Sequence, residues 1–132
     1  KRMPMVRDGF TWLKGFTRVE FISYGYFLAE ELVIRGEYYD AFLLLEQIIK
    51  MEYSYQYFYI FFPEVLDFTL NILKHNIDTV ISDELALDVY ERALELGFGK
   101  KEERFFLNKM GQEYQRLGDI HTANLCFKAA EM

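Results

Sequence analysis

Apolar residues recur every three or four positions along most of the chain, which is the spacing of amphipathic helices. This spacing predicts one helix from Val19 to Arg35 and a second from Tyr39 to Met51. Gly36 lies between them, and so short a turn makes the two helices antiparallel. The apolar positions are Phe21, Tyr24, Gly25, Leu28, Ala29 and Leu32 in the first helix and Ala41, Leu44, Leu45, Ile48 and Ile49 in the second.

Two further pairs of helices follow. Pro63 suits the first turn of a helix whose apolar line is Leu66, Leu70, Leu73 and Ile77. Ser82 is a predicted N-cap for the next helix, which ends at Gly97 and has the apolar positions Leu85, Ala86, Val89, Tyr90, Ala93 and Leu94. The last pair breaks at 117–119. We predict an all-α chain of three hairpins, at about 19–51, 63–97 and 102–131, after a lead of residues 1–18 that caps one end.

The segment 53–62 reads YSYQYFYIFF and has a strong β-propensity. A strand is therefore an alternative there, but we interpret the segment as a loop that leads into a helix. Its aromatic residues exceed what a short connection buries, so they either pack against the first pair or form a contact surface. They are Tyr53, Tyr55, Tyr57, Phe58, Tyr59, Phe61 and Phe62.

The last pair carries a recognisable pattern of small and bulky residues. Its first helix has Leu107, Met110, Gly111 and Tyr114, its turn has Gly118, and its second helix has Ala123, Phe127 and Ala130. This pattern resembles the tetratricopeptide repeat (TPR), which has Leu-Gly-x-x-Tyr in the first helix and Ala-x-x-x-Phe in the second. Small residues at the crossing let the two helices approach closely, and Tyr and Phe fill the space beside them.

The first pair matches the same frame more loosely, through Gly25, Ala29 and Ala41, and the middle pair matches it only in its second helix, at Ala86 and Tyr90. The second-helix alanines also lie farther apart than the ~34-residue period of the family. The resemblance covers residues 21–132 and implies a right-handed α-α superhelix whose first helices line a concave groove. An ordinary helical bundle is the alternative architecture.

The resemblance also implies which residues contact a ligand. Groove positions are the polar or aromatic positions of each first helix that lie off the apolar line. In this sequence they are Tyr26, Glu30, Asn71, His75, Phe105, Asn108, Gln112, Gln115 and Arg116. Asn71, Asn108 and Gln112 are the preferred contacts, because a carboxamide both donates to and accepts from a peptide backbone. Some TPR proteins hold a C-terminal carboxylate with basic residues, but Tyr26 and Glu30 stand where such a clamp begins, so none is predicted.

Composition narrows the classes of partner. The chain has 132 residues, 21 acidic and 15 basic side chains and a net charge of −6, which disfavours direct binding to nucleic acid. The longest apolar run, 57–62, is much shorter than the ~20 residues of a membrane-spanning helix. Cys126 is the single cysteine, so a reducing, cytoplasmic location is expected.

No pattern in the sequence indicates catalysis, a cofactor or a metal. His75 lies three residues before Asp78, but such a pair on a helix is more often a local salt link than an acid–base device. His121 falls in the first turn of the last helix, where we expect it to face water. Neither histidine is accompanied by a nucleophile motif or a phosphate-binding loop, so we expect no enzymatic activity.

The sequence therefore predicts a scaffold that binds a protein or peptide through its groove. The alternative is a peptide-sensing or oligomerisation domain of a bacterial transcriptional regulator, by analogy with helical-repeat domains that hold short peptides with asparagines. A second copy of the chain is a further candidate partner, because no polar capping helix covers the last predicted helix. The contact would then use the 53–62 aromatic segment or this last helix.

Overall fold

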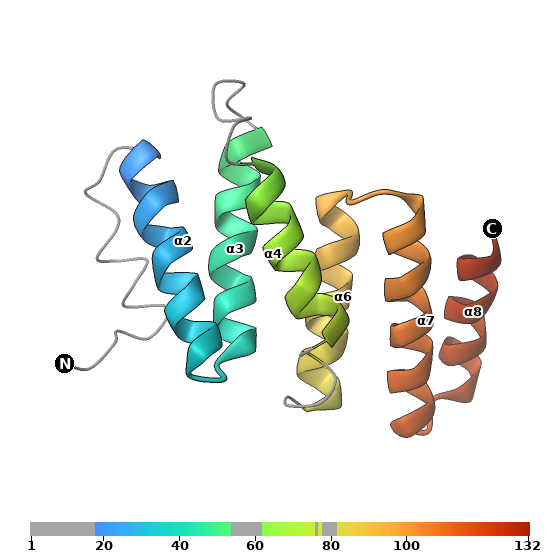
Figure 1. Cartoon of the computed structure of the whole chain (residues 1–132). Coiled ribbons are helices and arrows are strands. Elements are labelled where there is room, and N and C mark those ends of the chain that lie inside the picture. Colours follow the sequence, from blue (N-terminus) through green and yellow to red (C-terminus); the bar gives the residue numbers. More distant parts are fainter. Residues whose placement is uncertain (1–17, 54–61, 76, 78–81) are drawn as a thin grey trace. The chain divides into compact units, whose positions relative to one another are not determined.

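In the computed structural model, the described residues are 18–53, 62–75, 77 and 82–132, and their regular structure is entirely helical (Figure 1). This confirms the predicted all-α class for the described part of the chain. Nearly all of the predicted lead, 1–17, and most of the aromatic segment, 54–61, lie outside the described residues. The chain divides into two compact units, residues 1–80 and 81–132, and each is described by itself below.

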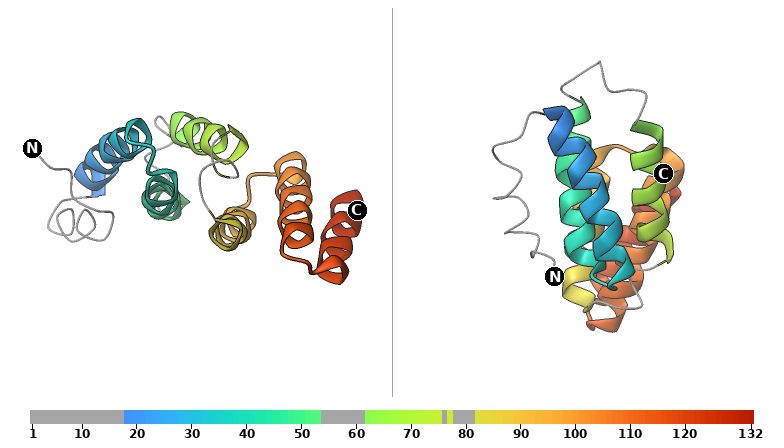
Figure 2. Two further views of the ribbon diagram at one scale, coloured as in Figure 1. Left: turned by 90° about the horizontal axis from the view of Figure 1, so that it is seen from below. Right: turned by 60° about the vertical axis from the view of Figure 1, so that its left-hand side comes forward.

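The first unit contains α2 (Arg18–Ile34), α3 (Tyr38–Tyr53) and α4 (Phe62–His75), and α3 packs against both of the others. In the end-on view of Figure 2, α2 and α4 lie on the same side of α3. The inward face of α3 is completely buried and confirms the predicted apolar line. It consists of Ala41, Leu44, Leu45, Ile48 and Ile49.

The predicted turn between the first two helices is also confirmed. Gly36 has φ 79°, and its N–H donates to the carbonyl of Val33 while the N–H of Glu37 donates to that of Leu32. This pair of bonds is the usual glycine termination of a helix. The turn places Gly25 of α2 against α3, where an added Cβ would lie 3.1 Å from Ile48 Cδ1.

Two predicted apolar positions are wrong. Tyr24 and Leu85 are 46% and 40% exposed. Successive residues lie about 100° apart around a helix, so the neighbours that point inward, Gly25 on α2 and Ala86 on α6 (Asp83–Leu96), turn these two side chains away from the core. On α2, Ile22 is buried instead.

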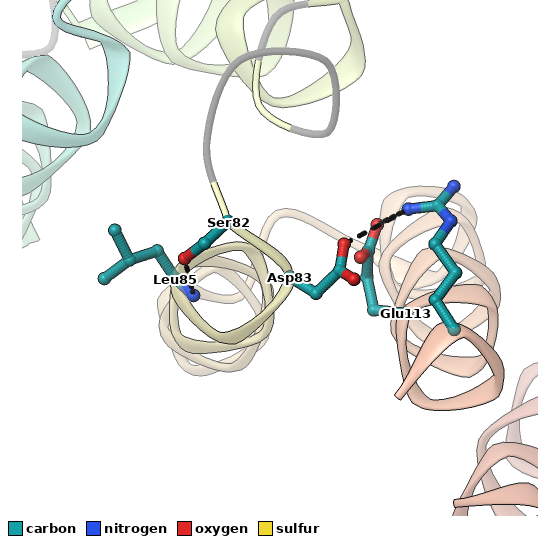
Figure 3. A network of polar contacts seen from close by, with 5 residues as sticks. Ser82, Asp83, Leu85 and Glu113 are labelled. Atoms are coloured by element: carbon teal, nitrogen blue, oxygen red, sulfur yellow. Dashed lines mark hydrogen bonds and ion pairs between the residues drawn. The ribbon is translucent and has the colours of Figure 1, made fainter. Parts of the chain in front are cut away.

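The second unit contains α6, α7 (Lys100–Arg116) and α8 (Ile120–Glu131), and α7 packs against both α6 and α8. Phe106 of α7 is fully buried, and its ring lies 6.2 Å from that of Tyr90 and 6.0 Å from that of Phe98. The predicted N-cap of α6 is confirmed, because Ser82 Oγ accepts a hydrogen bond from the N–H of Leu85 at 3.3 Å (Figure 3).

The crossing of α7 and α8 is tighter than that of α2 and α3. Gly111 is buried, and a Cβ added there would lie 2.7 Å from Phe127 Cδ1. Ala123 is completely buried on the facing helix, so the small residues predicted at this crossing are confirmed. The ring of Phe127 lies directly over Gly111 and uses the space that a side chain would occupy.

The connection between α7 and α8 repeats the glycine turn of the first unit. Gly118 has φ 87°, its N–H donates to the carbonyl of Gln115, and the N–H of Asp119 donates to that of Tyr114. Asp119 then caps α8, since its carboxylate accepts from the N–H of Thr122 at 3.1 Å and from Thr122 Oγ1 at 2.7 Å. These bonds hold the pKa of Asp119 below its usual value.

The predicted middle pair, 63–97, has one helix in each unit, α4 in the first and α6 in the second. Its pairing therefore stays a prediction, as does the superhelix that the repeat resemblance implies.

Candidate functional site

The predicted ligand residues of the first unit lie on α2 and α4. Tyr26 of α2 meets Phe68 of α4 edge to face, with ring centroids 5.4 Å apart. Burial, and then the charges of Glu30 and Glu64, raise the pKa of the Tyr26 hydroxyl. The structure thus brings Tyr26 near an acidic group from each helix.

Asn71 and His75 continue this surface along α4. They are exposed and lie seven and eleven residues after the exposed Glu64, which places all three on one face of the helix. Val65, Ile72 and Leu73 are buried and fix which side of α4 faces the core. An aromatic hydroxyl with carboxylates and an amide nearby suits a partner that carries positive charge and backbone hydrogen-bonding groups. We call Tyr26, Glu30, Glu64, Asn71 and His75 the acidic face of the first unit.

The predicted ligand residues of the second unit lie on α7. Asn108, Gln112 and Gln115 are exposed and follow one another at spacings of four and three residues, so they form one line along the helix. Phe105 is half-buried at the start of this line, and Lys109 Nζ lies 5.7 Å from the centre of its ring. Buried Phe106 and Met110 anchor the opposite side of α7. We call Asn108, Gln112 and Gln115 the amide line.

Arg116, the last predicted ligand residue, makes ion pairs within the protein. Its Nη1 lies 2.5 Å from Glu113 Oε1, on the same helix, and 3.6 Å from Asp83 Oδ1 in the first turn of α6. Figure 3 shows the carboxylates of Asp83 and Glu113 directed toward each other. The guanidinium therefore bridges two acids from neighbouring helices, at the end of the amide line.

Glu113 is the buried acid of this network, and its pKa is raised. Its side chain is 1% exposed, and Oε2 accepts no hydrogen bond from any N–H or O–H group of the described chain. Burial first, and then a hydrogen bond shared with Asp83, raise the pKa of Glu113 to about 7, although Arg116 acts in the opposite direction. A proton held between the two carboxyl groups would satisfy Oε2.

Glu113 is not among the residues predicted from the sequence. A signal for it existed, because Glu113 lies three residues after Met110 and seven after Phe106, in phase with the apolar line of α7. An acid at such a position needs a partner, and Arg116 one turn later is a visible candidate. The contribution of Asp83, thirty residues earlier, had no counterpart in the local pattern.

Within the described residues, the side chains considered for catalysis do not come together in one site. His75 is exposed, and Asp78 lies outside the described residues. His121 is exposed in the first turn of α8, as expected. Cys126 is buried, which raises the pKa of its thiol and disfavours the reactive thiolate. Within the described ranges, no group of three or more His, Cys, Asp or Glu residues is placed to hold a metal ion.

None of the helices described here combines the length and the apolar character needed to cross a lipid bilayer. No protein-family model, curated protein or solved structure matches the chain. The interpretation of its function therefore depends on the acidic face and the amide line.

Proposed function

We propose that the chain is a TPR-like helical-repeat module that binds a protein or peptide partner along the exposed faces of its first helices. The observation that carries the proposal is the amide line on α7, set on a hairpin whose tight crossing matches the repeat pattern. A helix that is rigidly held on one side presents its exposed amides at fixed positions, so little entropy is lost when they bind an extended backbone.

The chemistry of the two faces indicates the kind of partner. Three amides along one helix suit the alternating N–H and C=O groups of an extended peptide, because each carboxamide can satisfy both. On the first unit, Glu30 and Glu64 beside Tyr26 favour a partner segment with Lys or Arg side chains. The amide line therefore favours an extended protein segment, and the acidic face favours a basic one.

A synthetic peptide array tests this proposal, with binders then measured in solution by fluorescence anisotropy. The decisive variant carries Asn71→Ala, Asn108→Ala and Gln112→Ala together. Because a few contacts carry most of the energy of an interface, we expect the dissociation constant to rise at least about tenfold.

The matched controls are exposed amides on second helices. Gln47 lies on α3 and Asn124 on α8, and both are exposed. Gln47→Ala and Asn124→Ala should leave peptide binding unchanged, while far-UV circular dichroism verifies that each variant is folded. Wild-type affinity in the triple variant, or a chain that binds no peptide of the array, would refute the proposal.

A further inference from the structure

The outer side of α2 carries an exposed line of residues in which two large apolar side chains flank an acid. Phe27 is 59% exposed and Ile34 76%, and the exposed Glu30 lies between them. The two apolar residues are seven positions apart, which is two helical turns or about 10 Å along the axis. The line is distinct from the side of α2 that packs on α3, which contains Gly25, Leu28 and Leu32.

The outer side of α8 carries a line of the same form with the opposite charge. Leu125 of α8 is 54% exposed, and Met132, which directly follows the helix as its C-cap, is 84% exposed. They are again seven positions apart, and the exposed Lys128 lies between them. This line is also distinct from the side of α8 that packs on α7, which contains Ala123, Cys126 and Ala130. The two lines therefore match in spacing and in apolar character, and they are complementary in charge.

Because the charged residue is near the midpoint of each line, the match holds when the two helices run antiparallel as well as when they run parallel. Each apolar pair can then pack against the other while Glu30 and Lys128 face each other. The contact would repeat one that the second unit already contains, since α7, the first helix of a predicted pair, packs on α6, the second helix of the pair before it.

We propose that a second copy of this chain docks on the first, with the α2 line of one copy packed on the α8 line of the other. The contact joins two different surfaces, and two copies can make it once or twice in a reciprocal pair. Association increases as concentration rises. The interface is small and therefore weak, with assemblies in rapid exchange.

The first experiment is sedimentation velocity of the purified chain over a wide range of concentrations, without any peptide. We expect the average mass to rise steadily above that of the monomer as the concentration increases. A chain that stays monomeric at every concentration would overturn the proposal, because the α2 line and the α8 line would then not bind each other.

The second experiment blocks one line at a time. Phe27→Asp removes the α2 line and Leu125→Asp the α8 line, and both side chains are more than half exposed, so the fold tolerates the changes. Each variant alone should be monomeric. An equimolar mixture should form a dimer and nothing larger, because each variant retains the line that the other lacks. Self-association of either variant alone would show that a different surface makes the contact.

The third experiment tests the charge between the apolar residues. Glu30→Lys and Lys128→Glu should each weaken association by at least a few-fold, and the double variant should restore it by re-forming the pair with reversed signs. The pairing would be refuted if the double variant associated no more strongly than the weaker of the two single variants. Glu30 also belongs to the acidic face, but the peptide test changes Asn71, Asn108 and Gln112, which lie outside both lines. Self-association is measured without peptide, so failure of either test leaves the other proposal standing.

Discussion

The α2–α3 and α7–α8 hairpins use the same glycine turn, and each has a glycine where its two helices meet, but they differ in the room beside that glycine. Both turn at a glycine with positive φ, and both place a glycine of the first helix against the second helix. At Gly25 the nearest atom to an added Cβ is the flexible end of Ile48, at 3.1 Å, whereas at Gly111 it belongs to the rigid ring of Phe127. The two glycines stand at different places in the pattern, since Gly25 lies eleven residues before Gly36 and Gly111 seven residues before Gly118. Glycine is therefore required at Gly111 and replaceable at Gly25.

The hairpins also differ in the charged groups that surround their buried glutamate. Glu46 of α3 is 1% exposed, and Lys50 of the same helix lies 3.8 Å from its Oε2. Glu113 of α7 is equally buried, but its neighbours include Asp83 from another helix, so two acids share one arginine. The acid of the second unit is therefore coupled to the packing of α6 on α7.

The largest expected effect is that of Gly111→Ala. The new Cβ would overlap the Phe127 ring, and overpacking of this kind costs about 1–3 kcal/mol, of which the higher helix propensity of alanine offsets up to about 1 kcal/mol. Urea denaturation followed by circular dichroism measures the loss. Hydrogen exchange should show faster exchange of amides in α7 and α8, which locates the loss in the second unit.

A second substitution distinguishes steric overlap from other causes. Phe127→Leu removes the ring, so Gly111→Ala should cost much less in that background, with a coupling energy of about 1–2 kcal/mol in the double-mutant cycle. If the losses in the free energy of unfolding were additive, the Phe127 ring and Gly111 would not be in contact.

The next effect concerns pH. Glu113 has a pKa of about 7 in the folded protein and near its usual 4.5 in the unfolded chain, so between these values the folded state binds more protons. Its contribution is fully favourable below about pH 4.5 and is lost as the pH rises through 7. Glu113→Gln should therefore stabilise the protein at pH 8, by on the order of 2 kcal/mol, and change little at pH 4.5.

The glutamine suits the site because its amide can donate to Asp83 while its oxygen accepts from Arg116. The measurement is the free energy of unfolding of wild type and variant at several pH values from 4.5 to 8. Glu95→Gln on the exposed side of α6 is the control for the loss of one negative charge. Equal pH dependence of Glu113→Gln and wild type would contradict the coupling of Glu113 to Asp83.

The smallest effect is expected at Gly25. The end of Ile48 can move by a few tenths of an ångström, and alanine is the better helix former by about 1 kcal/mol, so Gly25→Ala should change stability by less than about 0.5 kcal/mol. The same urea titration checks this value. A loss as large as that of Gly111→Ala would remove the distinction between the two hairpins.

Much of the fold was predictable because its signals are local. Pro63, Ser82 and the turn glycines Gly36 and Gly118 mark helix ends through their own backbone preferences, and the described helices begin and end within a few residues of the predicted places. Tyr24 was misplaced because a wide apolar stripe does not show which of its edges meets the neighbouring helix. That choice depends on tertiary packing.

The site was less predictable. The repeat pattern selected the exposed residues of the amide line, since exposure follows from the helical phase. It also selected Arg116, whose ion pairs with Glu113 and Asp83 depend on how α6 packs against α7. The raised pKa of Glu113 could not be predicted for the same reason, because its neighbour Asp83 comes from a separate helix.

The capped turn at Asp119 has a consequence for the order of folding. Its hydrogen bonds to Thr122 and the glycine turn before it join α7 and α8 through residues that are close neighbours in the chain. Contacts of short sequence separation form with little loss of loop entropy, and they form fast. We therefore expect the α7–α8 hairpin to serve as the nucleus on which α6 assembles, so that substitutions in this turn slow refolding more than they speed unfolding.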